Sequence, residues 1–122
     1  MILGVGTDII EILRIEEAIS NNSNFLNRLF TEKEIQMFKK RKMKSEVIAG
    51  NFSAKEAISK TLGTGVRGFS FKDIEILRDE LGKPIVYLNE NIERIIGRNY
   101  KINLSISHNN TSAIAFAVLE EI

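Results

Sequence analysis

Apolar residues recur at helical spacing from Asn51 to Gly65 (NFSAKEAISKTLGTG), and this stretch organises the rest of the chain. Five residues fall at the i, i+3, i+4, i+7 and i+8 positions of one buried stripe: Ala54, Ala57, Ile58, Thr61 and Leu62. The pattern predicts a long central helix, capped at Ser45 and running to about Leu62. Gly63 can end it, because glycine readily adopts the positive φ of a helix C-terminus.

The first half of the chain predicts a strand followed by helices. Ile2, Leu3 and Val5 open the segment Met1 to Ile12 as a short apolar strand. Gly4 and Gly6 within that strand indicate either a bend or a close approach of another backbone. A short helix is expected from Leu13 to Ile19, then an apolar patch from Phe25 to Phe30 that carries Arg28. Thr31 and Glu34 have the spacing of a capping box, so another helix begins at Thr31.

After Gly68 the hydrophobic period changes from helical to two, which is typical of strands. Phe69–Asp79 and Ile85–Leu88 predict a hairpin that turns at Glu80–Pro84. Asn89 or Asn91 can cap a short helix that ends at Gly97. Two more strands, Lys101–Ser107 and Ala113–Leu119, are joined by the turn His108–Ser112. This order of elements predicts an α+β fold, with residues 1–122 as a single domain and the long helix packed on an antiparallel sheet.

Composition narrows the possible functions. The 122 residues include 17 Lys and Arg against 16 Asp and Glu, so the net charge does not favour nucleic acid or a membrane surface as a partner. The absence of cysteine excludes disulfides and thiolate catalysis, and a single histidine makes zinc a poor candidate. No long apolar run or leader is evident, and a cytoplasmic location is expected.

Three sets of polar residues could carry chemistry. Asp8 follows the first strand among aliphatic residues, where it either caps a turn or binds a metal. Glu56 and Lys60 lie one turn apart on the central helix, as a solvated ion pair or as part of a site. His108, at a strand end, is either a surface residue or a catalytic one. Asp and Glu without Cys form an oxygen donor set that suits Mg²⁺, and a neighbouring Lys would neutralise phosphate oxygens.

A cluster of basic residues, KKRKMK at Lys39–Lys44, has two possible explanations. It is either a solvated helix end whose cations interact favourably with the helix dipole, or a contact for a polyanion. Together with Asp8, Glu56 and Lys60, the residue types of the chain permit a magnesium-assisted phosphoryl or diester transfer site.

Four motifs occur in order along the chain: GVGTDIIEILRI (Gly4–Ile15), FSAKEAISKTLGTG (Phe52–Gly65), DELGKP (Asp79–Pro84) and SISH (Ser105–His108). Together they closely resemble the holo-acyl-carrier-protein synthase family, the small bacterial 4′-phosphopantetheinyl transferases, over nearly the whole chain. The resemblance implies transfer of 4′-phosphopantetheine from coenzyme A to a serine of apo-acyl carrier protein, a reaction that serves fatty acid biosynthesis. It also implies that adenosine 3′,5′-bisphosphate leaves and that the enzyme is a homotrimer with active sites between subunits.

The resemblance assigns roles to individual residues. Asp8 and Glu56 are similar to the family's two Mg²⁺ ligands, Lys60 to the lysine that neutralises the pyrophosphate, and His108 to the active-site histidine. Three further residues match positions that line the coenzyme A groove: Thr64, Gly65 and Pro84. Three others resemble the surface that docks the acidic carrier protein: Arg14, Phe25 and Arg28.

The chain departs from the family pattern at Asn51, where members commonly carry an arginine that helps to hold coenzyme A. Arg41 and Lys44 are candidate replacements. Two alternative functions stay open at this point. One is another magnesium-dependent phosphotransferase, and the other is a binding module whose cluster Lys39–Lys44 grips an acidic protein or RNA.

Overall fold

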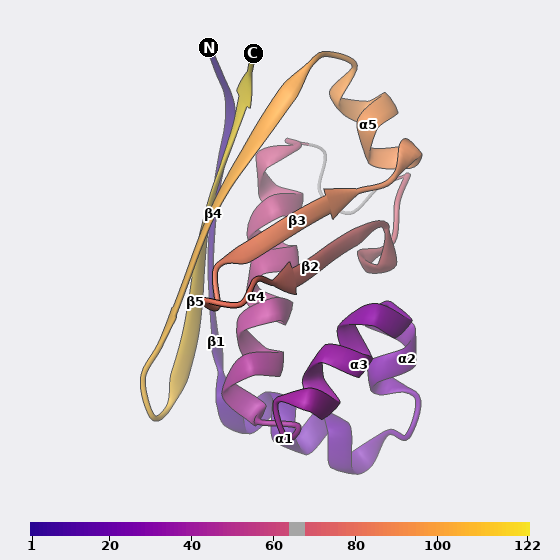
Figure 1. The fold of residues 1–122 in the computed structure, drawn as a ribbon, viewed down its shortest axis with the longest axis vertical. Coiled ribbons are helices and arrows are strands. Elements are labelled where there is room, and N and C mark those ends of the chain that lie inside the picture. Colours follow the sequence, from indigo (N-terminus) through magenta and orange to yellow (C-terminus); the bar gives the residue numbers. More distant parts are fainter. Residues whose placement is uncertain (64–67) are drawn as a thin grey trace.

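The long helix α4 packs across one face of a three-stranded antiparallel sheet, and the remaining helices and a hairpin lie on the same side of that sheet (Figure 1). The computed structural model describes residues 1–63 and 68–122. The elements in chain order are β1 (Ile2–Glu11), α1 (Ile12–Asn21), α2 (Phe25–Leu29), α3 (Glu32–Lys40), α4 (Ser45–Thr61), the 3₁₀ turn η1 (Phe71–Asp73), β2 (Ile74–Arg78), β3 (Pro84–Leu88), α5 (Glu90–Ile96), β4 (Tyr100–His108) and β5 (Ser112–Glu121).

The larger sheet has the strand order β1-β5-β4, so the two chain ends lie side by side in it. Asp8 of β1 pairs with Ala115 of β5, which pairs in turn with Ile106 of β4. The inward face of β5 consists of small residues, Ala113, Ala115 and Ala117, all buried. Their short side chains allow α4 to pack closely on the centre of the sheet. The hairpin β2–β3 forms a separate two-stranded sheet.

Gly4 and Gly6 bring β1 into direct contact with α4. A Cβ atom at Gly6 would collide with the backbone carbonyl oxygen of Ala57, and one at Gly4 with that of Thr61. The close approach indicated by the sequence is therefore confirmed. Its consequence is that residues just after Gly6 lie next to the helix turn that contains Ala57.

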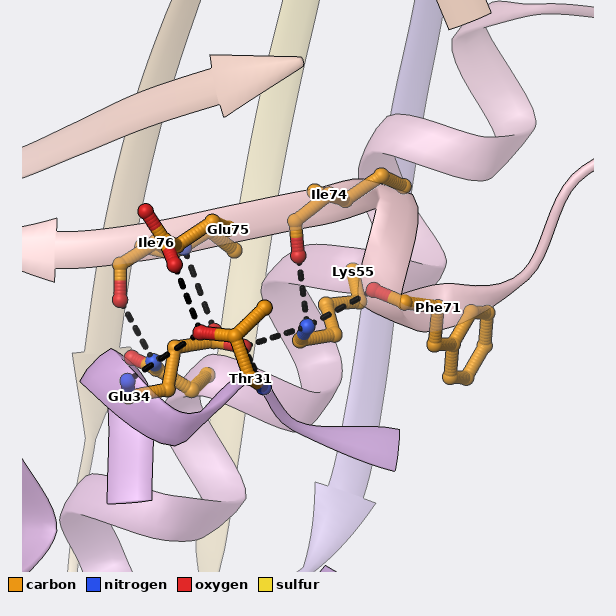
Figure 2. Close-up of polar contacts among 8 residues, drawn as sticks. Thr31, Glu34, Lys55, Phe71, Ile74, Glu75 and Ile76 are labelled. Atoms are coloured by element: carbon orange, nitrogen blue, oxygen red, sulfur yellow. Dashed lines mark hydrogen bonds and ion pairs between the residues drawn. The ribbon is translucent and has the colours of Figure 1, made fainter. Parts of the chain in front are cut away.

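A fully buried ion pair ties α3, α4 and β2 together (Figure 2). The Nζ atom of Lys55 lies 2.7 Å from Oε1 of Glu34 and donates to the carbonyl oxygens of Phe71 and Ile74. Glu34 also accepts hydrogen bonds from three other groups: the backbone N–H groups of Thr31 and Ile76 and the side-chain amide of Asn51. Each charge is thus compensated by several partners, as a buried pair requires. We call Glu34, Asn51 and Lys55 the buried polar cluster.

Burial raises the pKa of Glu34 and lowers that of Lys55, and in each case the partner charge opposes the shift. The desolvation of both groups is therefore only partly offset by their attraction.

Most predicted elements are confirmed, including the capping box at Thr31, the hairpin, the Asn89 cap and the positive φ of Gly63. The α+β fold with a long helix on an antiparallel sheet is confirmed as well.

Three local predictions were wrong. Asp8 is not at a strand end, because β1 continues pairing with β5 as far as Glu11. Ser45 is not the cap of α4: Lys44 holds that position in extended backbone, without a side-chain cap. The segment Phe69–Asp79 begins with a 3₁₀ turn, because Ser70 and Asp73 form a capping box, and the strand starts only at Ile74.

None of the described helices combines the length and the apolarity that a membrane span requires.

Candidate active site

Asp8 of β1 and Glu56 of α4 line one cavity of about 350 Å³. The glycine contacts described above explain their proximity, since Gly6 lies two residues before Asp8 and meets Ala57, the neighbour of Glu56. Because side chains alternate along a strand, Asp8 points to the same face as Gly6, toward the helix. We call this hollow the acid cavity.

The carboxylate of Asp8 is held in place by a residue of the same helix. Ser53 is fully buried, and its Oγ lies 3.0 Å from the backbone carbonyl oxygen of Asp8 and 3.1 Å from its Oδ2. The Asp8 side chain is only 17% exposed. Ser53 therefore orients Asp8 while the carboxylate stays accessible from the cavity.

Lys60 borders the two acids. Its Nζ donates to the carbonyl oxygen of Thr7 at 2.8 Å and lies 3.6 Å from Oδ1 of Asp8, with the side chain 54% exposed. Among the described residues no ion pair joins Lys60 to Glu56, so the helical i,i+4 pair suggested by their spacing does not form. A long, exposed pair of this kind contributes little to stability. The ammonium group therefore remains available for a ligand.

Glu56 is the acid whose pKa is perturbed. Burial raises the pKa of its carboxyl group, the charge of Asp8 raises it further, and Lys60 partly opposes both effects. Two carboxylates that repel one another across a cavity create a site where a bound cation would be favoured.

The donor chemistry of the acid cavity fits a hard divalent cation. Asp8 and Glu56 offer only oxygen ligands, and within the described chain no cluster of three or more His, Cys, Asp or Glu side chains could hold a metal ion. Mg²⁺ commonly binds one or two protein carboxylates and completes its octahedron with water and substrate phosphates. The residues present therefore fit Mg²⁺ better than zinc, which prefers His and Cys.

Two other predicted ligand-binding residues, His108 and Pro84, do not join Asp8 and Glu56 within one chain. His108 is exposed at the end of β4, with the central strand β5 between it and β1. Pro84 lines a different cavity, of about 590 Å³, which residues of β3 and β4 border. Thr64 and Gly65 lie outside the described residues.

The predicted docking residues lie on α1 and α2, beside the acid cavity. Arg14 lines that cavity together with Asp8 and Glu56. Phe25 stacks on Phe52, another lining residue, with ring centroids 6.4 Å apart, and Arg28 is exposed on the same short helix as Phe25. The structure thus places Arg14 at the acid cavity and Phe25 against one of its lining residues, with Arg28 on the same helix as Phe25.

Sequence reasoning missed Ser53 and left the role of Asn51 open. Ser53 lies one turn before Ala57, on the helix face that meets β1. Gly4 and Gly6 indicated this close approach in the sequence, and the helix spacing from Ala57 could have pointed to Ser53. Asn51 stands where family members commonly carry an arginine, and its side chain is fully buried and bonds to Glu34, to the carbonyl oxygen of Ile76 and to Arg78. Asn51 therefore belongs to the protein interior.

Known proteins of one family match almost the full length of the chain. The model of the 4′-phosphopantetheinyl transferase superfamily matches residues 4–118. A holo-[acyl-carrier-protein] synthase of Clostridium perfringens strain 13 is 62% identical over 126 residues, covering 98% of this chain and 95% of the relative. A protein of the same name from Clostridium botulinum strain Eklund 17B is 59% identical, covering 100% of both chains.

Solved structures give the same result for the fold. The holo-(acyl-carrier-protein) synthase of Bacillus anthracis, crystallised in complex with CoA (3′,5′-ADP), superposes with a TM-score of 0.84 at 40% identity over 100% of this chain and 99% of that chain. The Helicobacter pylori holo-[acyl-carrier-protein] synthase in complex with coenzyme A gives a TM-score of 0.82 at 34% identity over 95% of this chain and 99% of that chain.

Proposed function

The chain belongs to the 4′-phosphopantetheinyl transferase superfamily, and from this membership we propose that it transfers 4′-phosphopantetheine from coenzyme A to a serine of apo-acyl carrier protein. The observation that carries the proposal is the meeting of Asp8 and Glu56, with Lys60 beside them, in one cavity. In the reaction the serine oxygen attacks the β-phosphorus of coenzyme A. The bond from that phosphorus to the bridging oxygen breaks, and adenosine 3′,5′-bisphosphate leaves.

We propose that Asp8 and Glu56 hold Mg²⁺, which when bound would draw negative charge from the phosphate oxygens. Ser53 keeps the Asp8 carboxylate oriented toward the cavity. Lys60 adds a second positive charge for the phosphates, since its Nζ is exposed and weakly paired.

The serine proton requires an acceptor. Glu56 is one candidate, because its raised pKa brings it closer to the range of an effective general base. A water molecule held beside Asp8 is the other, and both stay part of the proposal.

Arg14, Phe25 and Arg28 supply the proposed contact with the acidic carrier protein. Arg14 borders the acid cavity, and Phe25 packs on the aromatic residue Phe52 next to it. A carrier protein held by these residues would have its serine close to the two acids. We also propose that the protein acts in the cytoplasm, as the sequence led us to expect.

A homotrimer is the proposed assembly, and the outer face of the β1-β5-β4 sheet supports it. The helices lie on the opposite face (Figure 1), and four large apolar side chains are left exposed on the outer one. Val5 is 53% exposed, Ile9 68%, Ile114 44% and Phe116 48%. Apolar patches of this kind mark contacts with other chains. A neighbouring copy could then bring its His108 and Pro84 to the acid cavity, which one chain does not do by itself.

The test of the activity is the mass of the product. Apo-acyl carrier protein incubated with coenzyme A, Mg²⁺ and this enzyme should gain the mass of phosphopantetheine, and a Ser→Ala carrier protein should not. An unchanged mass under conditions in which a related synthase is active would reject the proposed transfer.

The shared site is tested by mixing two inactive variants. If Glu56 and His108 act from different subunits, Glu56→Ala and His108→Ala proteins should each be inactive, and refolding them together should restore part of the activity. Light scattering should give three times the mass of one chain. Activity that does not return on mixing, with a mixed trimer demonstrated, would place both residues in the same subunit's site.

A further inference from the structure

Contacts within this chain hold the charged groups of the acid cavity in place. Ser53 fixes Asp8, with its Oγ 3.0 Å from the carbonyl oxygen and 3.1 Å from Oδ2 of that residue. Lys60 is held by Thr7, whose carbonyl oxygen accepts a hydrogen bond from Nζ at 2.8 Å. The proposed carrier protein would therefore supply the nucleophile, while the groups that act on the phosphates are oriented without it.

The strand and the helix that carry these groups are also fixed relative to each other. Gly6 of β1 lies so close to Ala57 of α4 that a Cβ atom would collide with the carbonyl oxygen of the helix. Next to Glu56, the buried Lys55 lies 2.7 Å from Glu34 and ties the same helix turn to α3. Enzymes that work by induced fit assemble their catalytic groups only when the correct substrate binds. The acid cavity has the opposite arrangement, since its groups are assembled in the free chain.

The acid cavity is also large and polar enough to hold water. Its volume of about 350 Å³ far exceeds the roughly 30 Å³ that one water molecule occupies in the liquid. The carboxylate oxygens of Asp8 and Glu56 can accept hydrogen bonds from a water molecule there. Beside them, the Lys60 side chain is 54% exposed to solvent. Water therefore has access to the space that the hydroxyl group of the acceptor serine would fill.

We propose that the acid cavity has a second activity, the hydrolysis of coenzyme A when no carrier protein is bound. This inference rests on the proposed function, because it uses the same two acids and the same lysine. The water oxygen forms a bond to the β-phosphorus, and the bond from that phosphorus to the bridging oxygen breaks. The electron pair stays on the bridging oxygen, so adenosine 3′,5′-bisphosphate leaves and 4′-phosphopantetheine is released. The water proton passes to the group that accepts the serine proton in the transfer, and then to solvent.

Water should react more slowly than the serine of a docked carrier protein. Docking holds the serine in line with the β-phosphorus, and reactants held in this way gain orders of magnitude in rate over free ones. Active sites that close and expel water avoid such side reactions. We expect hydrolysis to be roughly a hundredfold to ten-thousandfold slower than transfer, because water gains only the charges of the cavity and not the docking.

The experiment incubates the full-length enzyme with coenzyme A and Mg²⁺ in ¹⁸O-labelled water, without carrier protein. Mass spectrometry of the products shows which phosphorus water attacks: attack on the β-phosphorus places ¹⁸O in 4′-phosphopantetheine, and attack on the other one places it in adenosine 3′,5′-bisphosphate. Asp8→Asn and Glu56→Gln each remove one charge of the acid cavity, so either tests the site if the other fails to fold. Glu90→Gln is the matched control, since this side chain is 90% exposed and is not among the cavity lining. Transfer to apo-acyl carrier protein is measured on the same preparations.

The wild type and Glu90→Gln should accumulate labelled 4′-phosphopantetheine at equal rates, and the two acid variants should lose at least roughly a hundredfold of that rate. Label in adenosine 3′,5′-bisphosphate instead, or equal rates in all four proteins, would overturn the inference. Transfer without hydrolysis would reject this inference alone, because the site would then act only with a carrier protein in place. The absence of both reactions would reject the proposed function as well.

Discussion

Two lysines of α4, five residues apart, differ in burial and in hydrogen bonding. Lys55 is fully buried, lies 2.7 Å from Glu34 and donates to two backbone carbonyl oxygens. Lys60 is half exposed, lies 3.6 Å from Asp8 and donates to one carbonyl. Both lysines pair with a carboxylate, so residue type does not distinguish them. The difference shows that completeness of hydrogen bonding separates a structural pair from one that can still bind a ligand.

The acids of the two regions differ in the same way. Glu34 accepts hydrogen bonds from four different residues, whereas Glu56 faces a cavity and is destabilised by Asp8. The buried polar cluster therefore contributes rigidity to α4, and the acid cavity retains unsatisfied charge for chemistry. The predictions below test this contrast.

The largest expected effect is on stability, in Lys55→Met. Removing the lysine leaves Glu34 buried without its counter-charge, which costs about 3–5 kcal/mol. Lys60→Met should change the free energy of unfolding by no more than about 0.5 kcal/mol, because the side chain is exposed. Urea denaturation of both variants measures the difference, and similar losses for the two lysines would contradict the contrast.

The next effect is on activity, in Asp8→Ala and Glu56→Ala. Each should lower turnover by at least roughly a hundredfold, because each removes a charge that the transfer needs. Glu90→Ala serves as the control, since this side chain is 90% exposed. Carrier-protein modification is followed under saturating Mg²⁺, with circular dichroism to verify folding. Near-normal turnover in either variant would remove that acid from the site.

Ser53→Ala should have a smaller effect, on both stability and turnover. Loss of its hydrogen bonds to Asp8 costs about 0.5–1.5 kcal/mol in stability, and poorer orientation of the carboxylate lowers turnover by roughly tenfold. Ser59→Ala is a close match, because Ser59 is also buried but bonds to the carbonyl oxygen of Lys55 instead. The two variants should lose similar stability, and only Ser53→Ala should lose activity. Equal turnover in both would mean that Ser53 has no positioning role.

The smallest effect concerns pH. The Glu56 pKa lies above the ordinary value of 4.5, so between these two pH values the folded protein holds a proton that the unfolded chain releases. Glu56 therefore contributes a loss of stability as pH rises through this window, and Glu56→Gln should remove that contribution. Carboxyl NMR titration of the metal-free protein should also show a lower Glu56 pKa in Asp8→Asn. An unchanged pKa there would indicate that Asp8 does not act on Glu56.

Most of the elements could be predicted, because their signals are local. The stripe from Ala54 to Leu62 defined α4, and alternation defined the strands on either side of the turn His108–Ser112. Errors fell where a longer-range contact competed with a local signal. Asp8 was expected after the strand, but pairing with β5 extends β1 beyond it.

The candidate site was predictable only in part. Asp8, Glu56 and Lys60 could be chosen from residue type and from the motifs of the family. Their meeting could not, because it depends on two glycines that fit against carbonyl groups of a helix far along the chain.

The sequence by itself determined the helices, the strands and the acids available for a cation, since these follow from spacing along a few residues. Tertiary structure decided which charges are neutralised. Lys55 and Glu56 are neighbours on the helix but point in different directions, Lys55 toward β2 and Glu56 toward β1. The groups packed on each side then decide the surroundings of each charge. Burial and hydrogen bonding are properties of that packing, and they decide whether a charge stabilises the fold or remains available for a ligand.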